Sequence, residues 1–175
     1  MANMLLETER LTLQEITTEH AGFLYKLMND PAWLQFIGDR NIDSIKTAED
    51  YIKNKIRPHY FEFGYGFYLV SLKENEVPVG VCGLVNRPTL EHVDVGFAFM
   101  PEHRQKGFGF ESASAIMTYA RTKLGIDYIV AITDLDNIGS IKLLEKLGLK
   151  FEKIMELDGD GKPCRLFVPK NTISE

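Results

Sequence analysis

The chain is poor in cysteine and has no long apolar run. Its two cysteines, Cys82 and Cys164, lie far apart, without the close spacing that a zinc site needs. We therefore expect neither a disulfide scaffold nor a metal, and a reduced, cytoplasmic protein. No apolar stretch approaches the roughly 18 residues of a membrane helix. The opening MANMLLETERLTLQEI becomes charged within seven residues, unlike a signal-peptide core.

An excess of positive charge is also missing. Lysine and arginine number 20 against 25 aspartates and glutamates, which gives a formal net charge of −5. That balance argues against a nucleic-acid partner, although it allows a compact basic site for one small anion. No linker, repeat or low-complexity tract divides the 175 residues. We expect a single domain over residues 1–175, long enough to bury a substantial core.

The hydrophobic pattern predicts a mixed α/β domain. Alternating segments indicate strands, apolar residues at helical spacing indicate helices, and Pro58 is expected to bend or end the helix in which it lies. Thr47 is the expected N-cap of that helix, and Gly148 the end of the last one. The expected order is a strand over 8–16, helices over 19–29 and 47–61, strands over 66–72, 79–85 and 92–100, a helix carrying Ala113 to Leu124, a strand over 128–133, a helix over 137–147, and strands over 149–157 and 165–168.

A glycine-rich loop stands directly before one predicted helix. The stretch HRQKGFGFES, His103–Ser112, carries Gly107 and Gly109 beside Arg104 and Lys106. The glycines alone are compatible with a tight turn and solvated charges. A helix N-terminus, however, offers unpaired N–H groups and about half a positive charge, so the same stretch is suited to holding an anion. The surroundings decide between these interpretations.

Two motifs in order resemble the GNAT superfamily of N-acetyltransferases, in the branch typified by RimJ and RimL. The first, R/Q-x-x-G-x-G/A, is matched from Arg104 to Gly109. The second, N-x-x-S followed by E-K-L-G, is matched by Asn137, Ser140 and the run from Glu145 to Gly148. ETERLTLQEI, NDP and VGVCGL also look like this branch, so the resemblance covers nearly the whole chain. A dinucleotide-binding Rossmann domain is disfavoured, because G-x-G-x-x-G is absent and the glycine loop lies mid-chain.

The resemblance implies a fold and a cosubstrate. The fold is a mixed, mostly antiparallel sheet of about seven strands, splayed in the middle and flanked by about four helices. The cosubstrate is acetyl-coenzyme A, with no metal. Backbone N–H groups from Gln105 to Phe110 would cradle its pyrophosphate, with Arg104 and Lys106 reaching phosphates. Main-chain groups near a bulge at Gly96 would hold the pantetheine arm and polarise the carbonyl. The implied coenzyme A residues are Phe97, Ala98, Phe99, Met100, Arg104, Gln105, Lys106, Gly107, Phe108, Gly109, Phe110, Asn137, Ser140, Leu143 and Lys146.

The acetyl group would pass directly to an amine, and the amine decides how much base catalysis is needed. A protein α-amine with a pKa of about 7.7–8.0 is roughly 10–15% neutral at pH 7, whereas a lysine amine is about 0.04% neutral. A modest base therefore suits an α-amine. Asp94, at an acidic position of the branch's AEIGY-like strand, is the first candidate, ahead of His92 and Glu91. For Asp94, an ordinary solvent-facing carboxylate is an equally open interpretation.

One departure from the superfamily concerns the general acid. Many members place a tyrosine seven residues after the motif asparagine, where this chain has Leu144. No tyrosine lies between Asn137 and Gly148. Either Ser140 assists the leaving thiol or no acid is used. The second alternative is chemically acceptable because a thiol with a pKa of about 8.5 leaves as the thiolate at modest cost. Asn137 is also the natural N-cap of its helix, and a cap is compatible with a cofactor contact.

The acceptor side is less determined. Trp33, Phe36 and Tyr65 lie where this branch builds its acceptor pocket, with His92 as a further candidate, and core packing is the alternative for the aromatic residues. Acidic residues over 158–160 would favour a cationic acceptor, but Asp-Gly pairs are also ordinary hairpin chemistry. The acceptor is expected to be a peptide or small-molecule amine and the protein a monomer or homodimer. Two alternatives stay open: an acetyltransferase of small amines such as aminoglycosides or polyamines, and a coenzyme A-binding regulatory module without catalysis.

Overall fold

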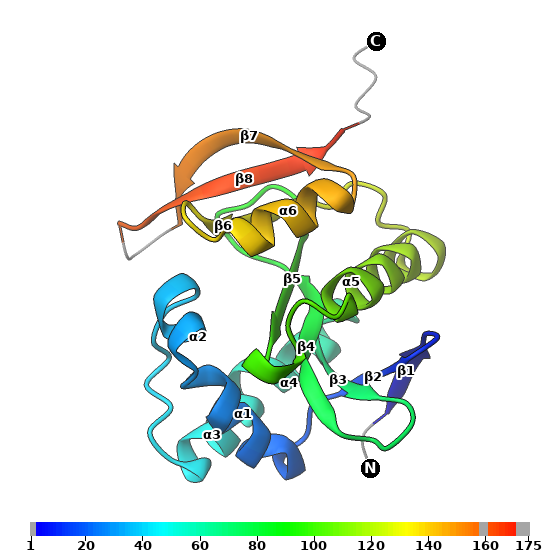
Figure 1. The fold of residues 1–175 in the computed structure, drawn as a ribbon, viewed down its shortest axis with the longest axis vertical. Helices are drawn as coiled ribbons and strands as arrows, with labels where there is room; N and C mark the ends of the chain where they lie inside the picture. The colour runs from blue at the N-terminus through cyan, green and yellow to red at the C-terminus, as the bar shows by residue number, and fades with distance from the viewer. Residues whose placement is uncertain (1–2, 158–160, 171–175) are drawn as a thin grey trace.

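The computed structural model describes residues 3–157 and 161–170, and it contains two antiparallel sheets that meet at a splayed seam. The first sheet has the order β1-β2-β3-β4-β5 and the second the order β6-β8-β7 (Figure 1). The predicted fold, a mostly antiparallel sheet splayed in the middle, is confirmed. The strands are β1 (Met4–Glu7), β2 (Leu11–Glu15), β3 (Phe67–Leu72), β4 (Pro78–Val85), β5 (Asp94–Phe99), β6 (Ala131–Asp134), β7 (Leu149–Glu156) and β8 (Pro163–Pro169).

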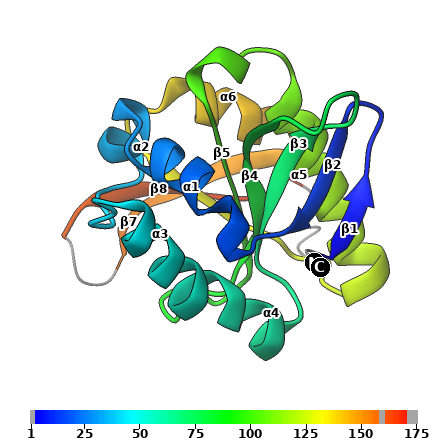
Figure 2. The same cartoon turned by 90° about the horizontal axis from the view of Figure 1, so that it is seen from below.

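Helices cover both faces of the first sheet. α1 to α4 lie on one face and α5 on the other, while α6 packs on the second sheet (Figures 1 and 2). Two π-helical turns extend them, η2 ahead of α4 and η4 behind α5. The helices are α1 (Ala21–Met28), α2 (Pro31–Phe36), α3 (Ile45–Tyr51), η2 (Ile52–Ile56), α4 (Arg57–Phe63), α5 (Phe108–Tyr119), η4 (Ala120–Leu124) and α6 (Ile138–Lys146).

The central strands are buried on both faces, which explains their nearly continuous apolar sequences. In β3, Tyr68 and Val70 face the core under α5, while Leu69 faces the core under α1 and α3. In β4, Val81 likewise joins the second of these cores, and its neighbour Cys82 the first. Period-two alternation thus distributes apolar side chains to two layers instead of to core and solvent.

Four local details differ from the sequence prediction. The first predicted strand, over 8–16, is β2, and a strand that the sequence did not predict, β1, precedes it and pairs with it. The segment after Asn29-Asp30 forms a further helix, α2, because the Asp30 carboxylate caps it by accepting from the Ala32 N–H and proline occupies its first turn. Ser44, not Thr47, caps α3, and Thr47 completes the capping box. Pro58 does not end its helix, which continues to Phe63 after the π-turn.

The two sheets touch at one bridge between strands. Asp94 pairs in parallel with Val130, just before β6, and beyond this bridge β5 and β6 diverge (Figure 1). β4 and β5 keep one continuous register through Gly96, so the predicted bulge there is wrong. Gly96 instead leaves room for a ring, since a Cβ at this position would lie 3.1 Å from the Phe67 Cζ. The divergence exposes the free edge of β5 to a cavity.

Candidate functional site

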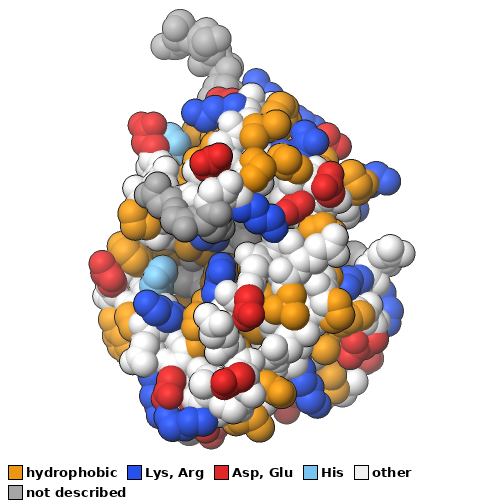
Figure 3. Space-filling model, turned by 90° about the vertical axis from the view of Figure 1, so that its left-hand side faces the viewer, with side chains coloured by type: hydrophobic (Ala, Val, Ile, Leu, Met, Phe, Trp, Pro, Cys, Tyr) orange, Lys and Arg blue, Asp and Glu red, His pale blue; other side chains and the backbone are white. Residues whose placement is uncertain are grey.

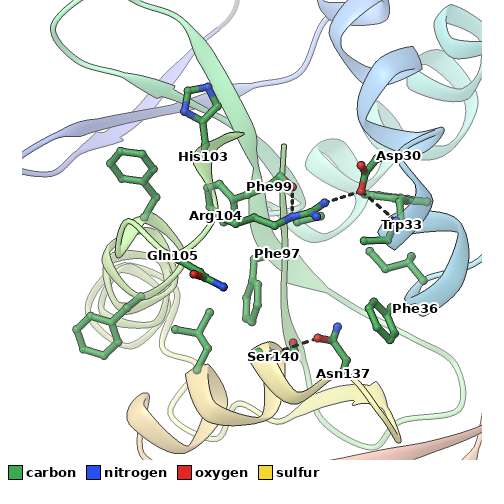
Figure 4. A pocket seen from close by; sticks show the side chains of 18 of the residues that line it. Asp30, Trp33, Phe36, Phe97, Phe99, His103, Arg104, Gln105, Asn137 and Ser140 are labelled. Carbon is green, nitrogen blue, oxygen red and sulfur yellow. Dashed lines mark hydrogen bonds and ion pairs between the residues drawn. The ribbon is translucent and has the colours of Figure 1, made fainter. Parts of the chain in front are cut away.

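Two cavities meet at the splayed seam. One, here called the glycine-loop cavity, has a volume of about 410 Å³ and lies between the 103–110 loop, β5, α2 and α6 (Figure 4). The other, the Asp94 cavity, has about 370 Å³ and lies between β5, α2, η2 and β6. The cavities are contiguous around β5 and α6. The residues that line both are Trp33, Phe36, Ile37, Phe97, Ala98, Asn137 and Ser140.

The glycine loop presents backbone N–H groups that nothing else uses. Gln105 and Gly107 have φ of 59° and 83°, the left-handed region that glycine adopts without strain. Within residues 3–157 and 161–170, no hydrogen bond engages the backbone N–H groups from Gln105 to Phe110. The first is Glu111, whose N–H donates to the Gly107 carbonyl at 3.0 Å. A left-handed loop that opens a 12-residue helix with free N–H groups has the geometry that suits an anion.

Arg10, which the sequence motifs did not indicate, holds this loop in place. Its Nη1 donates to the Lys106 carbonyl at 2.9 Å, and its guanidinium lies 4.6 Å from the centre of the Phe108 ring. Its Nε and backbone N–H also donate to the two carboxylate oxygens of Glu111. Burial raises the pKa of Glu111, but hydrogen bonds from Thr8 and Arg10 outweigh it, so the pKa is lowered and the carboxylate stays ionised. The β1–β2 turn therefore clamps the start of α5.

Arg104 occupies a different place from the one predicted. Its Nε donates to the Phe99 carbonyl at 3.0 Å, and its Nη2 forms an ion pair with the buried Asp30 (Figure 4). Asp30 is also the cap of α2, so the arginine links the glycine loop to the helix that carries Trp33. The prediction that Arg104 reaches a phosphate gains no support from this geometry. Its observed role is to join the two walls of the glycine-loop cavity.

The other predicted coenzyme A residues gather around the same cavity. All of them line it except Met100 and Lys106. Lys146 lies 4.2 Å above the Phe110 ring, so the two form the outer wall together. Gly109 serves helix packing as well as access, because a Cβ there would lie 2.8 Å from the Leu143 Cδ2. A side chain at position 109 would therefore displace the end of Leu143 in the contact between α5 and α6.

The free edge of β5 supplies polar backbone between the cavities. Met100 donates to Val79 on the β4 side, and Val95 donates to Val130 on the β6 side, each at 2.9 Å. Successive residues of a strand direct their backbone groups to alternate edges. The N–H and C=O of Phe97 therefore point to the β6 side, where the strands have already diverged. This edge is available to an extended ligand with amide groups.

The N-terminus of α6 stands opposite that edge. The Asn137 side chain caps the helix by accepting from the Ser140 N–H at 3.2 Å, as predicted for a cap (Figure 4). The Ser140 hydroxyl has no hydrogen-bond partner among the residues the structure describes, and it lies where the cavities join. Leu144, at the position where many members of the superfamily carry a tyrosine, is buried in the core. Ser140 is thus the side-chain hydroxyl that α6 offers to both cavities.

Asp94 is a buried carboxylate on the floor of the second cavity. It is 1% exposed and accepts from the Arg87 Nε at 3.2 Å and 3.3 Å. Burial raises its pKa from 3.8 to about 6, and Arg87 opposes the rise. The interpretation of Asp94 as a solvent-facing carboxylate is therefore wrong. A carboxylate poised near neutrality can exchange protons at physiological pH.

The structure divides the predicted acceptor residues. Trp33 and Phe36 line both cavities from α2, and the Trp33 Nε1 is buried without a hydrogen-bond partner in the described ranges. Tyr65 instead packs in the core beside Phe63, with ring centroids 5.9 Å apart. His92 lies outside both cavities and packs on Tyr128. His92 lies in the bend before β5, so the strand does not fix its direction, and burial of an aromatic ring decides Tyr65.

The continuous helical stretch of α3, η2 and α4 contributes lining residues that the sequence analysis did not name as site residues. Tyr51, Lys55 and His59 line the Asp94 cavity from one helix face, and Arg40 lines it from the loop after α2. Their spacing of four residues was a signal of a shared face, but which face lies inward depends on packing. The acidic residues 158–160 lie outside the described residues. In the described part of the chain, no cluster of His, Cys, Asp and Glu fits a metal ion, and no helix is long and apolar enough to cross a bilayer.

Comparisons with known proteins agree with this geometry. A family model described as an acetyltransferase (GNAT) domain matches residues 10–150. Over 153 residues the chain is 28% identical to the uncharacterized N-acetyltransferase YoaA of Bacillus subtilis (strain 168), which covers 86% of this chain and 85% of that protein.

Solved structures with the same fold include two acetyltransferases. RimL, a ribosomal L7/L12 α-N-protein acetyltransferase in complex with coenzyme A, aligns with a TM-score of 0.79 at 20% identity, covering 96% of this chain and 99% of that chain. An acetyltransferase of Salmonella typhimurium that modifies the N-terminal serine of 50S ribosomal subunit protein L7/L12 aligns with a TM-score of 0.78 at 18% identity, covering 95% and 98%. At these identities the likeness concerns the fold.

Proposed function

The chain belongs to the GNAT acetyltransferase family, and on that premise we propose that it is a RimJ/RimL-like acyltransferase that moves an acetyl group from acetyl-coenzyme A to a primary amine, with a protein N-terminal α-amine favoured. The observation that carries the proposal is the pair of cavities that meet at Phe97 and Ser140. One cavity ends in an anion cradle and the other in a buried carboxylate. A donor and an acceptor can thus approach one another from two sides.

The glycine-loop cavity fits coenzyme A. Free N–H groups from Gln105 to Phe110 would hold the pyrophosphate, with Arg10, which contacts the loop, and Lys146 of α6 as cations beside it. The open edge at Phe97 would bind the pantetheine amides by strand-like hydrogen bonds. The bound donor supplies an activated thioester. This chain's residues place that thioester at the junction of the cavities.

The residues of the Asp94 cavity would handle the proton. As the amine nitrogen bonds to the acetyl carbon and the carbon–sulfur bond breaks, one proton must leave the nitrogen. The Asp94 carboxylate, with its pKa of about 6, would accept that proton directly or through a water. Such a base is weak, so it suits an α-amine, which is already partly neutral at pH 7. The titles of the RimL neighbours, which name α-N-protein and N-terminal serine acetylation, support the same acceptor.

Ser140 would assist the departing sulfur. Its hydroxyl has no partner among the described residues, so it is free to donate a hydrogen bond to the thiolate. Hydrogen bonds to charged groups contribute about 1.5–3 kcal/mol, so Ser140→Ala should lower kcat about tenfold or more and leave KM for the acceptor nearly unchanged. Steady-state thiol release measures both constants. Ser114→Ala, on α5 outside both cavities, is the matched control. An unchanged kcat in Ser140→Ala would contradict this role.

The test of the function is acetyl-coenzyme A turnover, followed by free-thiol release and by mass change of the acceptor. The acceptors are α-amino peptides, the same peptides with a blocked N-terminus and one lysine, polyamines and aminoglycosides. We expect transfer to α-amino peptides above all others. Transfer only to polyamines or aminoglycosides would favour a small-amine acetyltransferase. Coenzyme A binding without transfer to any acceptor would favour a regulatory module, an alternative motivated by leucine at position 144.

A further inference from the structure

The Asp94 cavity is positively charged in a negatively charged protein. Among the residues that the structure describes, four lysines and arginines line it, Arg40, Lys55, Arg87 and Lys162, against two carboxylates, Asp94 and Asp134. Over the whole chain the formal net charge is −5. Figure 3 views the side of the molecule on which α2 and α3 face the ends of β7 and β8, and it shows lysine and arginine side chains around a hollow. The described lining of this cavity thus carries a net positive charge, although the whole chain carries a net negative charge.

Ion pairs account for only half of these cations. Arg87 is paired with Asp94, and Lys162 with Asp134 at 2.9 Å. Arg40 and Lys55 form no ion pair or side-chain hydrogen bond with any residue in 3–157 or 161–170. Both side chains are exposed to solvent, so neither needs an internal partner to be stable. They remain available to a ligand.

Lys55 is brought to the cavity by an irregular helix. Side chains four residues apart drift around a regular α-helix, whose turn holds about 3.6 residues. The π-turn over Ile52–Ile56 holds more residues per turn and offsets that drift, so Tyr51, Lys55 and His59 share one face and all line the cavity. Pro58 provides a cause, because it lacks the N–H that would bond to the Asn54 carbonyl. The π-turn therefore keeps Lys55 on the helix face that lines the cavity.

The same cavity must receive the acceptor amine if the proposed function is right. Asp94 would attract the amine, while Arg40 and Lys55 would repel any additional positive charge and attract a negative one. From this arrangement, and resting on the proposed function, we propose that the acceptor carries a carboxylate close to its amine. An N-terminal peptide with acidic second and third residues has this chemistry, as does a free amino acid. Polyamines and aminoglycosides have the opposite charge.

The described walls thus differ from the expectation of a cationic acceptor, which rested on residues 158–160. Those residues lie outside the described ranges, whereas Arg40 and Lys55 lie within them. A carboxylate–cation contact in a solvent-open cavity is screened by salt, with a Debye length of about 8 Å at physiological ionic strength. The preference for an acidic acceptor should therefore shrink as the salt concentration rises.

The experiment compares two amidated peptides that begin with serine and differ only at their second and third residues, Asp-Glu against Asn-Gln. Free serine and serinamide form a third and fourth arm, which separate a peptide side-chain carboxylate from an α-carboxylate. At low salt we expect kcat/KM for the Asp-Glu peptide to exceed that for the Asn-Gln peptide about tenfold. The double variant Arg40→Gln with Lys55→Gln should reduce this ratio to about twofold. The double variant Arg40→Glu with Lys55→Glu, which inverts both charges, should reverse the preference.

A matched control and a binding arm make the outcome decisive. Lys53→Gln removes an exposed lysine of the same π-turn that does not line the cavity, and it should keep the tenfold ratio. Calorimetry with N-acetylated versions of both peptides, in the presence of coenzyme A, tests the charge preference without turnover. Equal use and equal binding of both peptides would overturn the inference. An equal loss in Lys53→Gln would also overturn it. Absence of transfer to every acceptor, with acidic peptides still preferred in binding, would refute only the proposed function.

Discussion

Gly107→Val should weaken coenzyme A binding at least tenfold. Gly107 adopts a φ of 83°, which a β-branched residue tolerates poorly, and its Cβ would lie 3.1 Å from the Arg10 Nη2. Strained backbone of this kind costs about 1–3 kcal/mol, and relief of that strain would turn the loop N–H groups away from the anion. Tenfold in Kd corresponds to about 1.4 kcal/mol, the lower part of this range. Calorimetric titration with coenzyme A measures the change.

Gly125→Val is the matched control for this prediction. Gly125 has a similar φ of 67°, ends η4 and lines neither cavity, and nothing lies within 4 Å of a Cβ placed there. Both variants should lose stability through backbone strain, whereas only Gly107→Val should lose coenzyme A affinity. If both variants bound coenzyme A equally well, the glycine loop would not be the phosphate cradle. Thermal unfolding without ligand separates the two effects.

Asp94→Asn should lower kcat about 100-fold at pH 7 and remove the acidic limb of the pH profile. General base catalysis typically increases the rate by a factor of about 10²–10⁴. Because an α-amine is already partly neutral, we expect the factor here to lie at the lower end of that range. In the unmodified protein, kcat should rise with pH through about 6 as Asp94 ionises. The amide side chain of the variant cannot accept a proton at any of these pH values, so the inflection near pH 6 disappears, while the pH dependence of the amine's own ionisation stays. A retained limb in the variant would assign the base elsewhere.

Asp134→Asn is the comparison for Asp94→Asn. Burial raises the pKa of Asp134, but the backbone N–H of Asp136 and the Lys162 ammonium outweigh it, so the pKa is lowered. This second carboxylate of the cavity is already ionised throughout the range in which Asp94 titrates. The acidic limb near pH 6 should therefore persist in Asp134→Asn. Its loss there would indicate that the limb reflects the charge of the cavity as a whole.

The raised pKa of Asp94 also predicts how stability depends on pH. Between pH 3.8 and about 6 the folded protein retains a proton on Asp94 that the unfolded chain has lost. The contribution of this group is thus fully present below pH 3.8 and is lost as pH rises through about 6. The stability of the unmodified protein relative to Asp94→Asn should fall over that window, by up to about 3 kcal/mol. Urea unfolding at several pH values follows it.

The fold and the glycine loop could be predicted because their causes are local. Left-handed backbone at Gly107, the asparagine cap of α6 and the period of the strands each depend on a few consecutive residues. Local signals failed where two structures were compatible with one pattern. The α2 segment carried a cap in Asp30 and a following proline, yet the sequence prediction placed no helix between residues 29 and 47. Pro58 predicted an interruption but not a π-turn.

The chemical environment of the site came from contacts between distant segments. Arg10 meets Glu111 across 101 residues, and Arg104 meets Asp30 across 74. The pKa of Asp94 depends on its burial and on Arg87, and Tyr65 is a core residue because of what packs around it. None of these facts follows from the spacing of residues along the chain, because a side chain's partners and solvation are set by packing in three dimensions.

The sequence by itself determined the family, the position of the glycine loop before a helix and the absence of a tyrosine at position 144, since each is a matter of which residue type stands in a short motif. Only the tertiary structure decided that Arg104 joins two walls of the glycine-loop cavity, that Asp94 is buried with a raised pKa, and that Arg40 and Lys55 line the Asp94 cavity without an ion pair to a described residue. Backbone conformation is dictated by neighbours in sequence, whereas charge and proton affinity are dictated by neighbours in space.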